Sequence, residues 1–98
     1  DVLMALGPNG MLVNVARGSV VDEPVLIEML QQNRIGGAAL DVFADEPNVP
    51  EALIELDNVV LSPHQGSPTH QTRYEMGALV VANLEAHFAG NPLLTPVV

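Results

Sequence analysis

The amino-acid sequence predicts an α/β fold built on a small parallel sheet. Three short apolar runs, at residues 11–16, 38–43 and 59–61, are each bounded by turn-forming residues, as is typical of buried strands. Segments with the apolar spacing of helices lie between the first two runs and after the third. This alternation favours parallel strands with helices on the faces of the sheet. Three strands would leave exposed edges, so we expect half of a larger domain rather than a whole fold.

The first elements are predicted to be a short helix and a buried strand. Residues 2–6 have a helical pattern that stops at the Gly-Pro pair 7–8. Residues 11–16 form a nearly continuous apolar run, which predicts a strand buried on both faces. Residues 17–19 form a turn after this strand, so the turn lies at the edge of the sheet where the strands end.

A longer helix is predicted to follow this turn. Asp22 can cap its first turn, where Pro24 is tolerated. Residues 33–37 end the helix, and the glycines at 36 and 37 are free to take positive φ. The apolar face of the helix is expected to contain residues spaced three and four apart: Val25, Leu26, Met29 and Leu30.

The middle of the chain is predicted to supply the two remaining strands. The strand at 38–43 runs into a polar loop at 44–48. Residues 50–55 are expected to form a short helical turn, and 57–58 a tight turn. The strand at 59–61 follows directly, so both strands deliver a loop to the same edge of the sheet.

The last quarter of the chain is predicted to be one long helix and a tail. Ser67 can cap a helix that has Pro68 in its first position and runs to about Phe88. Residues 89–92 contain glycine and proline, which stop the helix. The tail at 93–98 is expected to be extended.

The composition excludes several classes of partner. The 98 residues contain three arginines, no lysine and twelve acidic residues, for a net charge of −9. Because little in the chain neutralises phosphates, neither nucleic acid nor an anionic membrane surface is an expected partner. The chain has no cysteine, no bilayer-length apolar run and no signal-peptide pattern, so we expect a cytoplasmic protein.

The sequence also has features of a piece of a longer protein. It begins with Asp1, inside a helical pattern, rather than with Met. Hydrophobic residues make up 48% of the chain and the mean hydropathy is +0.28, which is high for a free-standing domain of this size. We therefore expect some of this apolar surface to pack on further parts of a larger chain.

Two predicted strands end in side chains that can do chemistry. Glu46 follows the strand at 38–43, and His64 follows the strand at 59–61. Ligands of open α/β sheets bind beyond the carboxyl ends of the strands, where both loops would lie. A carboxylate within reach of the imidazole would hold its tautomer and favour its protonated form, which suits a general acid/base.

Each of these residues also has a plainer interpretation. Glu46 could be a solvated loop charge, and His64 could be satisfied by backbone groups. Arg17 could be a turn arginine paired with one of the many carboxylates. His70 and His87 are interpreted as exposed helix residues. We expect no metal site at His64 and His70, because no third ligand is obvious.

Three sequence blocks carry a resemblance to a known family. They are NVARGSVVDEPVL at 14–26, GAALDVFADEP at 37–47 and NVVLSPHQGSPTHQTR at 58–73. In this order and spacing they resemble the C-terminal part of the NAD(P)-binding domain of D-isomer-specific 2-hydroxyacid dehydrogenases, and glyoxylate/hydroxypyruvate reductases in particular. The resemblance implies the second half of a Rossmann-type parallel sheet with flanking helices, in a fragment of a larger two-domain enzyme. Residues 1–98 would belong to the dinucleotide-binding domain, with 89–98 a tail leading toward a substrate domain.

The resemblance also implies roles for individual residues. Arg17 matches the arginine that binds the carboxylate and carbonyl oxygen of a 2-keto acid. His64 matches the catalytic histidine, and Glu46 matches the glutamate partner of that histidine. Asp41 matches an aspartate near the nicotinamide carboxamide. The cofactor-binding residues implied in this way are Ala16, Arg17, Asp41, His64 and Gly66.

The implied activity is reduction of a small 2-keto acid, glyoxylate or hydroxypyruvate, to the D-2-hydroxy acid, with NADH or NADPH and in a homodimer. The chain contains no G-x-G-x-x-G turn, so it leaves the choice of NAD or NADP open, and we expect the isolated chain to be inactive. Two alternatives stay open. Corepressors of the same family bind protein partners in a nucleotide-dependent way and keep the same three residues, and a bare structural fragment would have no activity.

Overall fold

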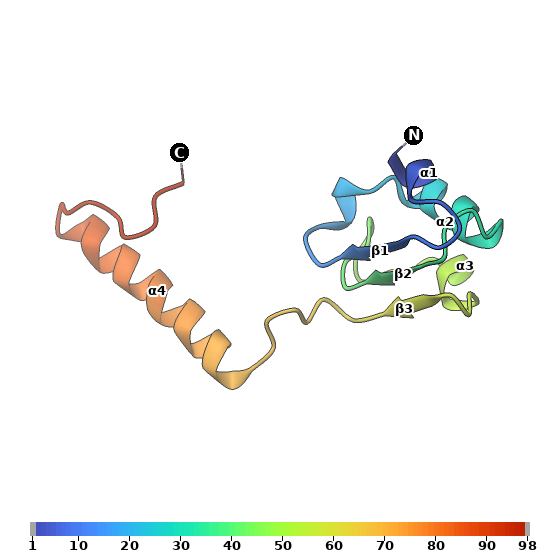
Figure 1. Ribbon diagram of the computed structural model, residues 1–98. Coiled ribbons are helices and arrows are strands. Elements are labelled where there is room, and N and C mark those ends of the chain that lie inside the picture. The colour runs from blue at the N-terminus through green and yellow to red at the C-terminus, as the bar shows by residue number, and fades with distance from the viewer. Residues whose placement is uncertain (1, 98) are drawn as a thin grey trace. The chain divides into compact units, whose positions relative to one another are not determined.

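The computed structural model describes residues 2–97 and divides into two compact units, Asp1–Gly66 and Ser67–Val98. The first unit contains helix α1 (Val2–Leu6), a short 3₁₀ helix η1 (Gly18–Val20), a three-stranded sheet and two further α-helices, whereas the second contains one long helix and a tail (Figure 1). The described helices and strands follow the predicted order. Each unit has its own architecture.

The sheet of the first unit is parallel throughout, as predicted. Strands β1 (Met11–Asn14), β2 (Gly37–Leu40) and β3 (Val59–Leu61) lie in the order β1-β2-β3. In the register of the sheet, Asn14 pairs with Leu40, and Leu40 pairs with Leu61. The three strands therefore end level with one another, and the loops that follow them all start from the same edge.

The helices between the strands begin where the sequence predicts. Asp22 is the N-cap of α2 (Glu23–Gln31), and its side chain accepts a hydrogen bond of 3.3 Å from the N–H of Val25. A proline occupies the first turn of α2, where its missing N–H costs no hydrogen bond. Helix α3 (Glu51–Ile54) is a single turn between β2 and β3, also as predicted.

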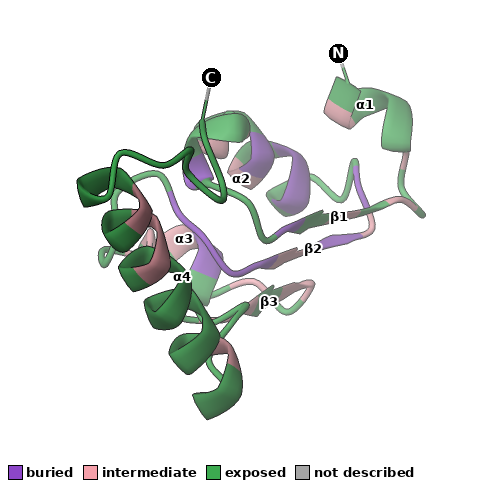
Figure 2. Cartoon of the chain, turned by 90° about the vertical axis from the view of Figure 1, so that its left-hand side faces the viewer, coloured by how far each residue is buried: buried purple, intermediate pink, exposed green. Residues whose placement is uncertain are grey.

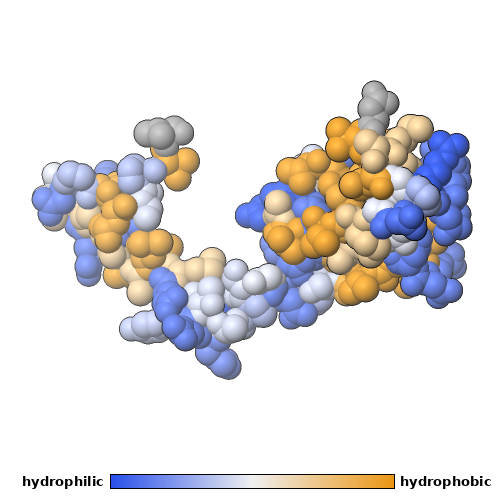
Figure 3. Space-filling model, in the orientation of Figure 1, coloured by the Kyte–Doolittle hydropathy of each residue, from blue (hydrophilic) through white to orange (hydrophobic). Residues whose placement is uncertain are grey.

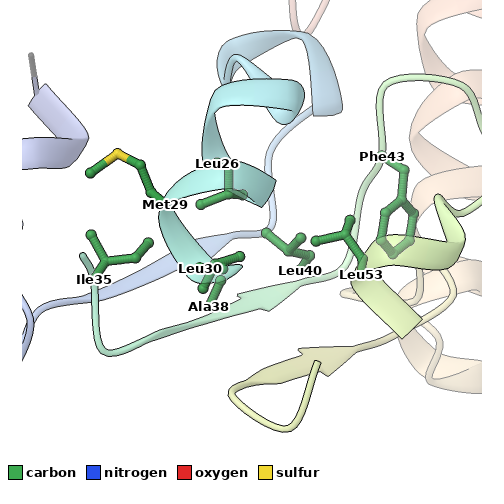
Figure 4. Packing of buried hydrophobic residues seen from close by; sticks show 8 residues of the cluster. All are labelled: Leu26, Met29, Leu30, Ile35, Ala38, Leu40, Phe43 and Leu53. Carbon is green, nitrogen blue, oxygen red and sulfur yellow. The ribbon is translucent and has the colours of Figure 1, made fainter. Parts of the chain in front are cut away.

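The hydrophobic core lies on one face of the sheet. Figure 4 shows side chains from α2, β2 and α3 converging there, and Figure 2 shows the same stretches as the buried part of the chain. Burial of these side chains provides the main stabilisation of the unit, since removing apolar surface from water is favourable. The core cluster comprises Leu26, Met29, Leu30, Ile35, Ala38, Leu40, Phe43 and Leu53.

The opposite face of the sheet is open, and the prediction of a strand buried on both faces is wrong. Along β1 and β3, Val13 is 65% exposed and Val60 is 68% exposed, and Val15 beyond β1 is 67% exposed. Within residues 2–66 no helix packs against them, because α2 and α3 both contribute to the core of the other face. Figure 3 shows hydrophobic residues gathered on the surface of this unit. Val25, predicted for the apolar face of α2, is also 41% exposed.

Two further details of the first unit differ from the sequence prediction. The ladder of β2 ends at Leu40, three residues earlier than expected. The N–H of Asp41 still donates to the carbonyl of Asn14 at 3.0 Å, and its side chain accepts the N–H groups of Gln65 and Gly66. After α2 the positive φ falls on Asn33, at 52°, and not on the glycines at 36 and 37. Asparagine tolerates this left-handed conformation better than most residues with a side chain.

The second unit consists of α4 (His70–Phe88) and the segment after it. Helix α4 starts later than predicted, because Thr69 caps it instead of Ser67: the Thr69 hydroxyl accepts a hydrogen bond of 3.1 Å from the N–H of Thr72. Its end at Phe88 is confirmed, and Gly90 follows with a φ of +70°. None of the described helices has the length and apolarity needed to cross a membrane.

The tail after α4 folds back on the helix rather than simply extending. The N–H groups of Leu94 and Thr95 donate to the Asn83 side-chain oxygen at 3.0 and 3.2 Å. The Asn83 amide nitrogen donates to the Thr95 hydroxyl at 3.0 Å. This network fixes the start of the tail, and Val98 lies outside the described residues.

Candidate active site

The carboxyl edge of the sheet brings together the loops that carry the residues singled out in the sequence. Arg17 lies in the turn after β1, Glu46 in the loop after β2, and His64 in the segment after β3. The level ends of the strands explain this convergence, because each loop starts from the same edge. This is the edge at which parallel α/β sheets bind ligands.

The prediction that Glu46 and His64 could meet is confirmed by their geometry. The Nδ1 atom of His64 lies 2.6 Å from Oε2 of Glu46. The side chains are 46% and 33% exposed, respectively. The imidazole is therefore held on one side by a carboxylate and is accessible to a ligand on another.

The second oxygen of Glu46 anchors the carboxylate to its own loop. Oε1 accepts a hydrogen bond of 3.1 Å from the N–H of Phe43. The hydrogen bond to His64 and then that from Phe43 hold the pKa of Glu46 below its ordinary value, and the positive charge of Arg17 acts in the same direction. Because an ionised carboxylate can only accept, the Nδ1 atom carries the proton, and Nε2 is left for chemistry.

The backbone at His64 adopts an uncommon conformation. Its φ is 49°, in the left-handed region that residues other than glycine uncommonly enter, although histidine is found there more often than most, as are asparagine and aspartate. Such a conformation costs on the order of 1–3 kcal/mol and persists where surrounding contacts hold it. The residues directly after His64 make those contacts.

Asp41 holds the turn that follows His64. Its Oδ1 accepts the N–H of Gln65 at 2.9 Å, and its Oδ2 accepts the N–H of Gly66 at 2.8 Å. Asp41 is only 7% exposed, and a Cβ on Gly66 would lie 3.2 Å from Oδ2, so the approach is close. One carboxylate thus fixes two successive peptide groups beside the histidine.

The charge of Asp41 is maintained by these contacts. The N–H of Gln65 lowers the pKa of Asp41 most, followed by the hydroxyl of Ser62, whereas burial acts in the opposite direction. The N–H of Gly66 lowers this pKa as well. A carboxylate that accepts several hydrogen bonds remains ionised well into the acid range.

The turn after β1 presents the guanidinium of Arg17. The buried side chain of Asn14 shapes this turn: its oxygen accepts the N–H of Ala16 at 3.1 Å, and its nitrogen donates to the carbonyl of Arg17 at 3.0 Å. The Arg17 guanidinium donates to the carbonyl of Ala16 at 2.6 Å and stays exposed. Its remaining donors are therefore available to an anionic ligand.

Two shallow pockets lie at this edge. One, of about 210 Å³, is formed around the Glu46–His64 pair and has Phe43, Pro47, Val49 and Pro63 as its apolar wall. The other, of about 230 Å³, extends from Asp41 and Gly66 onto the open face of the sheet, where the lining is apolar. The site thus combines a polar acid/base pocket with an apolar surface that ends at a buried carboxylate.

Sequence reasoning missed the residues that support the site through long-range contacts. Asn14 shapes the Arg17 turn, and the carboxylate of Glu23 accepts the N–H of Ala44 at 3.1 Å, in the loop that carries Glu46. The signal for Asn14 was a polar residue at the end of an apolar strand. For Glu23 nothing local distinguishes this contact from an ordinary acidic residue in the first turn of a helix.

The sequence analysis predicts no catalytic role for the other two histidines. His70 and His87 both lie in α4. Among residues 2–97, no group of three or more histidine, cysteine or acidic side chains is placed to hold a metal ion. The edge brings together a carboxylate–imidazole pair and a nearby guanidinium.

Comparison with known proteins agrees with this description of the first unit. The family model of the D-isomer specific 2-hydroxyacid dehydrogenase NAD binding domain matches residues 1–66, the same range as the first compact unit. The chain is 61% identical over 98 residues to hydroxyphenylpyruvate reductase of Plectranthus scutellarioides. It is also 61% identical over 98 residues to a glyoxylate/hydroxypyruvate reductase A of Arabidopsis thaliana.

The chain spans about a third of the length of these relatives: all of it aligns, with 31% of each of the two reductases. Among solved structures, it is similar to an NADPH-dependent glyoxylate/hydroxypyruvate reductase from Sinorhizobium meliloti in complex with NADP and malonate. That similarity has a TM-score of 0.95 at 56% identity, over 98% of this chain and 30% of the other. The fold is thus the second half of the Rossmann-type parallel sheet found in such enzymes.

Proposed function

Because the chain belongs to the family of D-isomer specific 2-hydroxyacid dehydrogenases, we propose that residues 1–98 are the C-terminal portion of a dinucleotide-binding domain. Residues 89–98 are then a tail that leads toward a substrate domain. The match of residues 1–66 to the NAD binding domain supports this assignment, as does the alignment of the whole chain with about a third of two reductases.

The proposed activity of the full-length protein is reduction of glyoxylate or hydroxypyruvate to the D-2-hydroxy acid, with NADH or NADPH as reductant. The observation that carries this proposal is the 2.6 Å contact between His64 Nδ1 and Glu46 Oε2. It leaves Nε2 free at a ligand-binding edge, where the imidazolium form can donate a proton. Reduction of a carbonyl requires one proton at oxygen for each hydride at carbon.

His64 and Glu46 have complementary parts in this reaction. As the hydride reaches the carbonyl carbon, negative charge grows on the carbonyl oxygen, and the His64 imidazolium stabilises it and transfers the Nε2 proton to it. Glu46 fixes the orientation of the ring through Nδ1. In the reverse direction, neutral His64 takes the proton from the hydroxyl group.

Arg17 is proposed to anchor the substrate. Its exposed guanidinium lies at the same edge and close enough to Glu46 to influence the pKa of that carboxyl. A planar guanidinium can bind the carboxylate of a 2-keto acid through two parallel hydrogen bonds, which a lysine cannot do. This contact would place the keto group beside His64.

The residues at the open edge fit a nicotinamide. An apolar wall that includes Val15 leads to the buried carboxylate of Asp41 and to Gly66. Asp41 already accepts two N–H groups and a hydrogen bond from the Ser62 hydroxyl, yet a carboxylate has about four acceptor sites, so it can also accept from a carboxamide. The carbonyl side of Ala16 borders the Arg17 guanidinium at this edge. When bound, the nicotinamide supplies the hydride.

We further propose that the full-length protein acts in the cytoplasm as a homodimer and binds neither nucleic acid nor membranes. The net charge of −9 supports the last two points, because like charges repel phosphate groups. The absence of cysteine in the chain is compatible with a reducing compartment. No observation on the described residues favours the corepressor alternative.

The test is an assay of the full-length protein that carries this chain. Oxidation of NADH and of NADPH is followed with glyoxylate, hydroxypyruvate and pyruvate. We expect turnover with at least one of the first two acids, and a loss of about 1,000-fold in kcat for the His64→Gln variant. The matched control is His70→Gln, which changes an exposed histidine of α4 and should retain wild-type turnover.

Wild-type turnover in the His64→Gln variant would contradict the assignment of the acid. Absence of turnover with every keto acid, despite tight binding of nucleotide, would contradict the proposed reaction itself. A size measurement by light scattering, at enzyme concentrations used in the assay, checks the homodimer.

A further inference from the structure

The loop that carries Glu46 is held by a contact outside the acid/base pair. Glu23, the first residue of α2, directs its carboxylate to this loop, where Oε2 accepts the N–H of Ala44 at 3.1 Å. The two residues are 21 positions apart in sequence. The contact therefore connects the helix that follows the Arg17 turn to the loop that supplies Glu46.

Successive backbone groups of this loop are all fixed. The N–H of Phe43 donates to Glu46 Oε1, and the N–H of Ala44 donates to Glu23. Between them, the carbonyl of Phe43 lies against Gly18, so closely that a Cβ on Gly18 would overlap it. The segment that positions Glu46 is thus pressed against the turn after β1 on one side and hydrogen-bonded to α2 on the other.

We propose that Glu23 is a positioning residue that sets the distance between Arg17 and the Glu46–His64 pair. This inference rests on the proposed function, because the distance matters only if Arg17 binds the substrate that His64 protonates. Glu23 touches neither the imidazole nor the guanidinium in the structure. It acts by holding the peptide of Ala44, and through it the loop in which Glu46 lies.

The chemistry of the contact makes Glu23 more than a favourable charge at a helix N-terminus. A carboxylate near the start of a helix is stabilising wherever it points. Here one of its oxygens accepts a hydrogen bond of 3.1 Å from a backbone N–H of another loop. Removal of the acceptor would leave the Ala44 peptide free to move, and the reacting groups would lose alignment.

The test uses three variants of the full-length protein: Glu23→Ala removes the acceptor, Glu23→Gln keeps an acceptor oxygen without the charge, and Glu28→Ala is the matched control. Glu28 lies on the same helix, and its carboxylate contacts only Gln32 of that helix among the described hydrogen bonds. We expect Glu23→Ala to lower kcat/KM for the keto acid about 10-fold, Glu23→Gln to restore most of it, and Glu28→Ala to match the wild type.

A second readout does not depend on turnover. The 13C carboxyl resonance of Glu46 reports its pKa, which the contacts to His64 and Phe43 lower in the wild type. In Glu23→Ala the loop loosens, so the pKa of Glu46 should rise toward its ordinary value, whereas a purely structural loss elsewhere would leave it unchanged. If the wild type has no reductase activity, the proposed function fails, but this titration still decides the role of Glu23.

Two results would overturn the inference. One is a Glu23→Ala variant with the same Glu46 titration as the wild type. The other is a Glu23→Gln variant as impaired as Glu23→Ala, which would show that the charge of Glu23, and not its hydrogen bond to Ala44, matters.

Discussion

Two carboxylates near the end of β2 hold the same histidine in different ways. Asp41, directly after the strand, is 7% exposed and accepts two backbone N–H groups. Glu46, five residues later, has a side chain 33% exposed and contacts the imidazole itself at 2.6 Å. Asp41 therefore fixes the backbone of the His64 turn, whereas Glu46 fixes the orientation of the ring.

Replacement of Asp41 by alanine should have the largest effect of the variants that separate these roles. Without the carboxylate, the N–H groups of Gln65 and Gly66 lose their acceptor, and nothing holds the φ of 49° at His64. We expect kcat of the full-length protein to fall roughly 100-fold, because the imidazole is displaced from its productive position. Steady-state kinetics at saturating keto acid measures this.

The nucleotide affinity of the same variant distinguishes a role of Asp41 in cofactor binding from its role in the His64 turn. If Asp41 acted only on the nicotinamide, the variant would bind NADPH or NADH more weakly and would keep the wild-type kcat at saturation. Fluorescence titration of the nucleotide separates the two cases, and a wild-type kcat would contradict the role of Asp41 as a clamp of the turn.

Replacement of Gly18 by alanine should disturb the loop that carries Glu46 and leave the contacts of Asp41 intact. The new Cβ would overlap the carbonyl of Phe43, so the backbone of the loop must shift. We expect a loss of about 2 kcal/mol in the free energy of unfolding, as for overpacked cores. Gly77→Ala in α4 is the control, because a Cβ there meets nothing within 4 Å and should stabilise the helix slightly. Chemical denaturation of both variants and the wild type measures the free energy of unfolding. A Gly18→Ala variant as stable as the wild type would be inconsistent with this packing.

Replacement of Glu46 by glutamine should have a smaller effect on the rate. The amide keeps one oxygen that can accept from Nδ1 of His64 but no longer places a negative charge beside the ring. We expect about a 10-fold loss of kcat/KM near neutral pH. The pH dependence of kcat/KM for reduction is the measurement, and a profile identical to that of the wild type would argue against electrostatic support from Glu46.

The smallest expected effect is on stability in acid. The pKa of Asp41 is lowered below the ordinary value of 3.8, so its contacts stabilise the folded protein above about this pH. That contribution disappears as the pH falls through the lowered pKa. Asp41→Asn should therefore be less stable than the wild type near pH 6, with the difference shrinking below about pH 4. Thermal unfolding of both proteins across this pH range measures the difference. A stability difference between the wild type and Asp41→Asn that grows in acid would contradict the prediction.

Much of the fold could be predicted from the sequence, because local patterns encode it. The apolar runs and the turns between them indicated the order of the elements, and Asp22 marked the start of α2 through its capping side chain. The cap at Thr69 was missed because Ser67 satisfies the same local rule two residues earlier. The open face of the sheet was missed because an apolar run does not reveal whether another element covers it.

The site was only partly predictable for the same reason. The spacing of strand ends placed Glu46 and His64 at one edge, and the structure brings them into contact. The contacts of Asp41 with Gln65, and of Glu23 with Ala44, span more than 20 residues and depend on how the loops fold back. No local pattern indicates which carboxylate of an acidic chain will accept a given N–H group.

A 13C titration of both carboxylates, in the wild type and in His64→Ala, separates the role of Glu46 from that of Asp41. In the wild type we predict pKa values below the ordinary 4.5 for Glu46 and below the ordinary 3.8 for Asp41. Removal of the imidazole should raise the pKa of Glu46 toward its ordinary value and leave that of Asp41 low, because the Gln65 N–H is its main cause. A Glu46 pKa that does not respond, or an Asp41 pKa that rises as much, would contradict the division of roles between the two carboxylates.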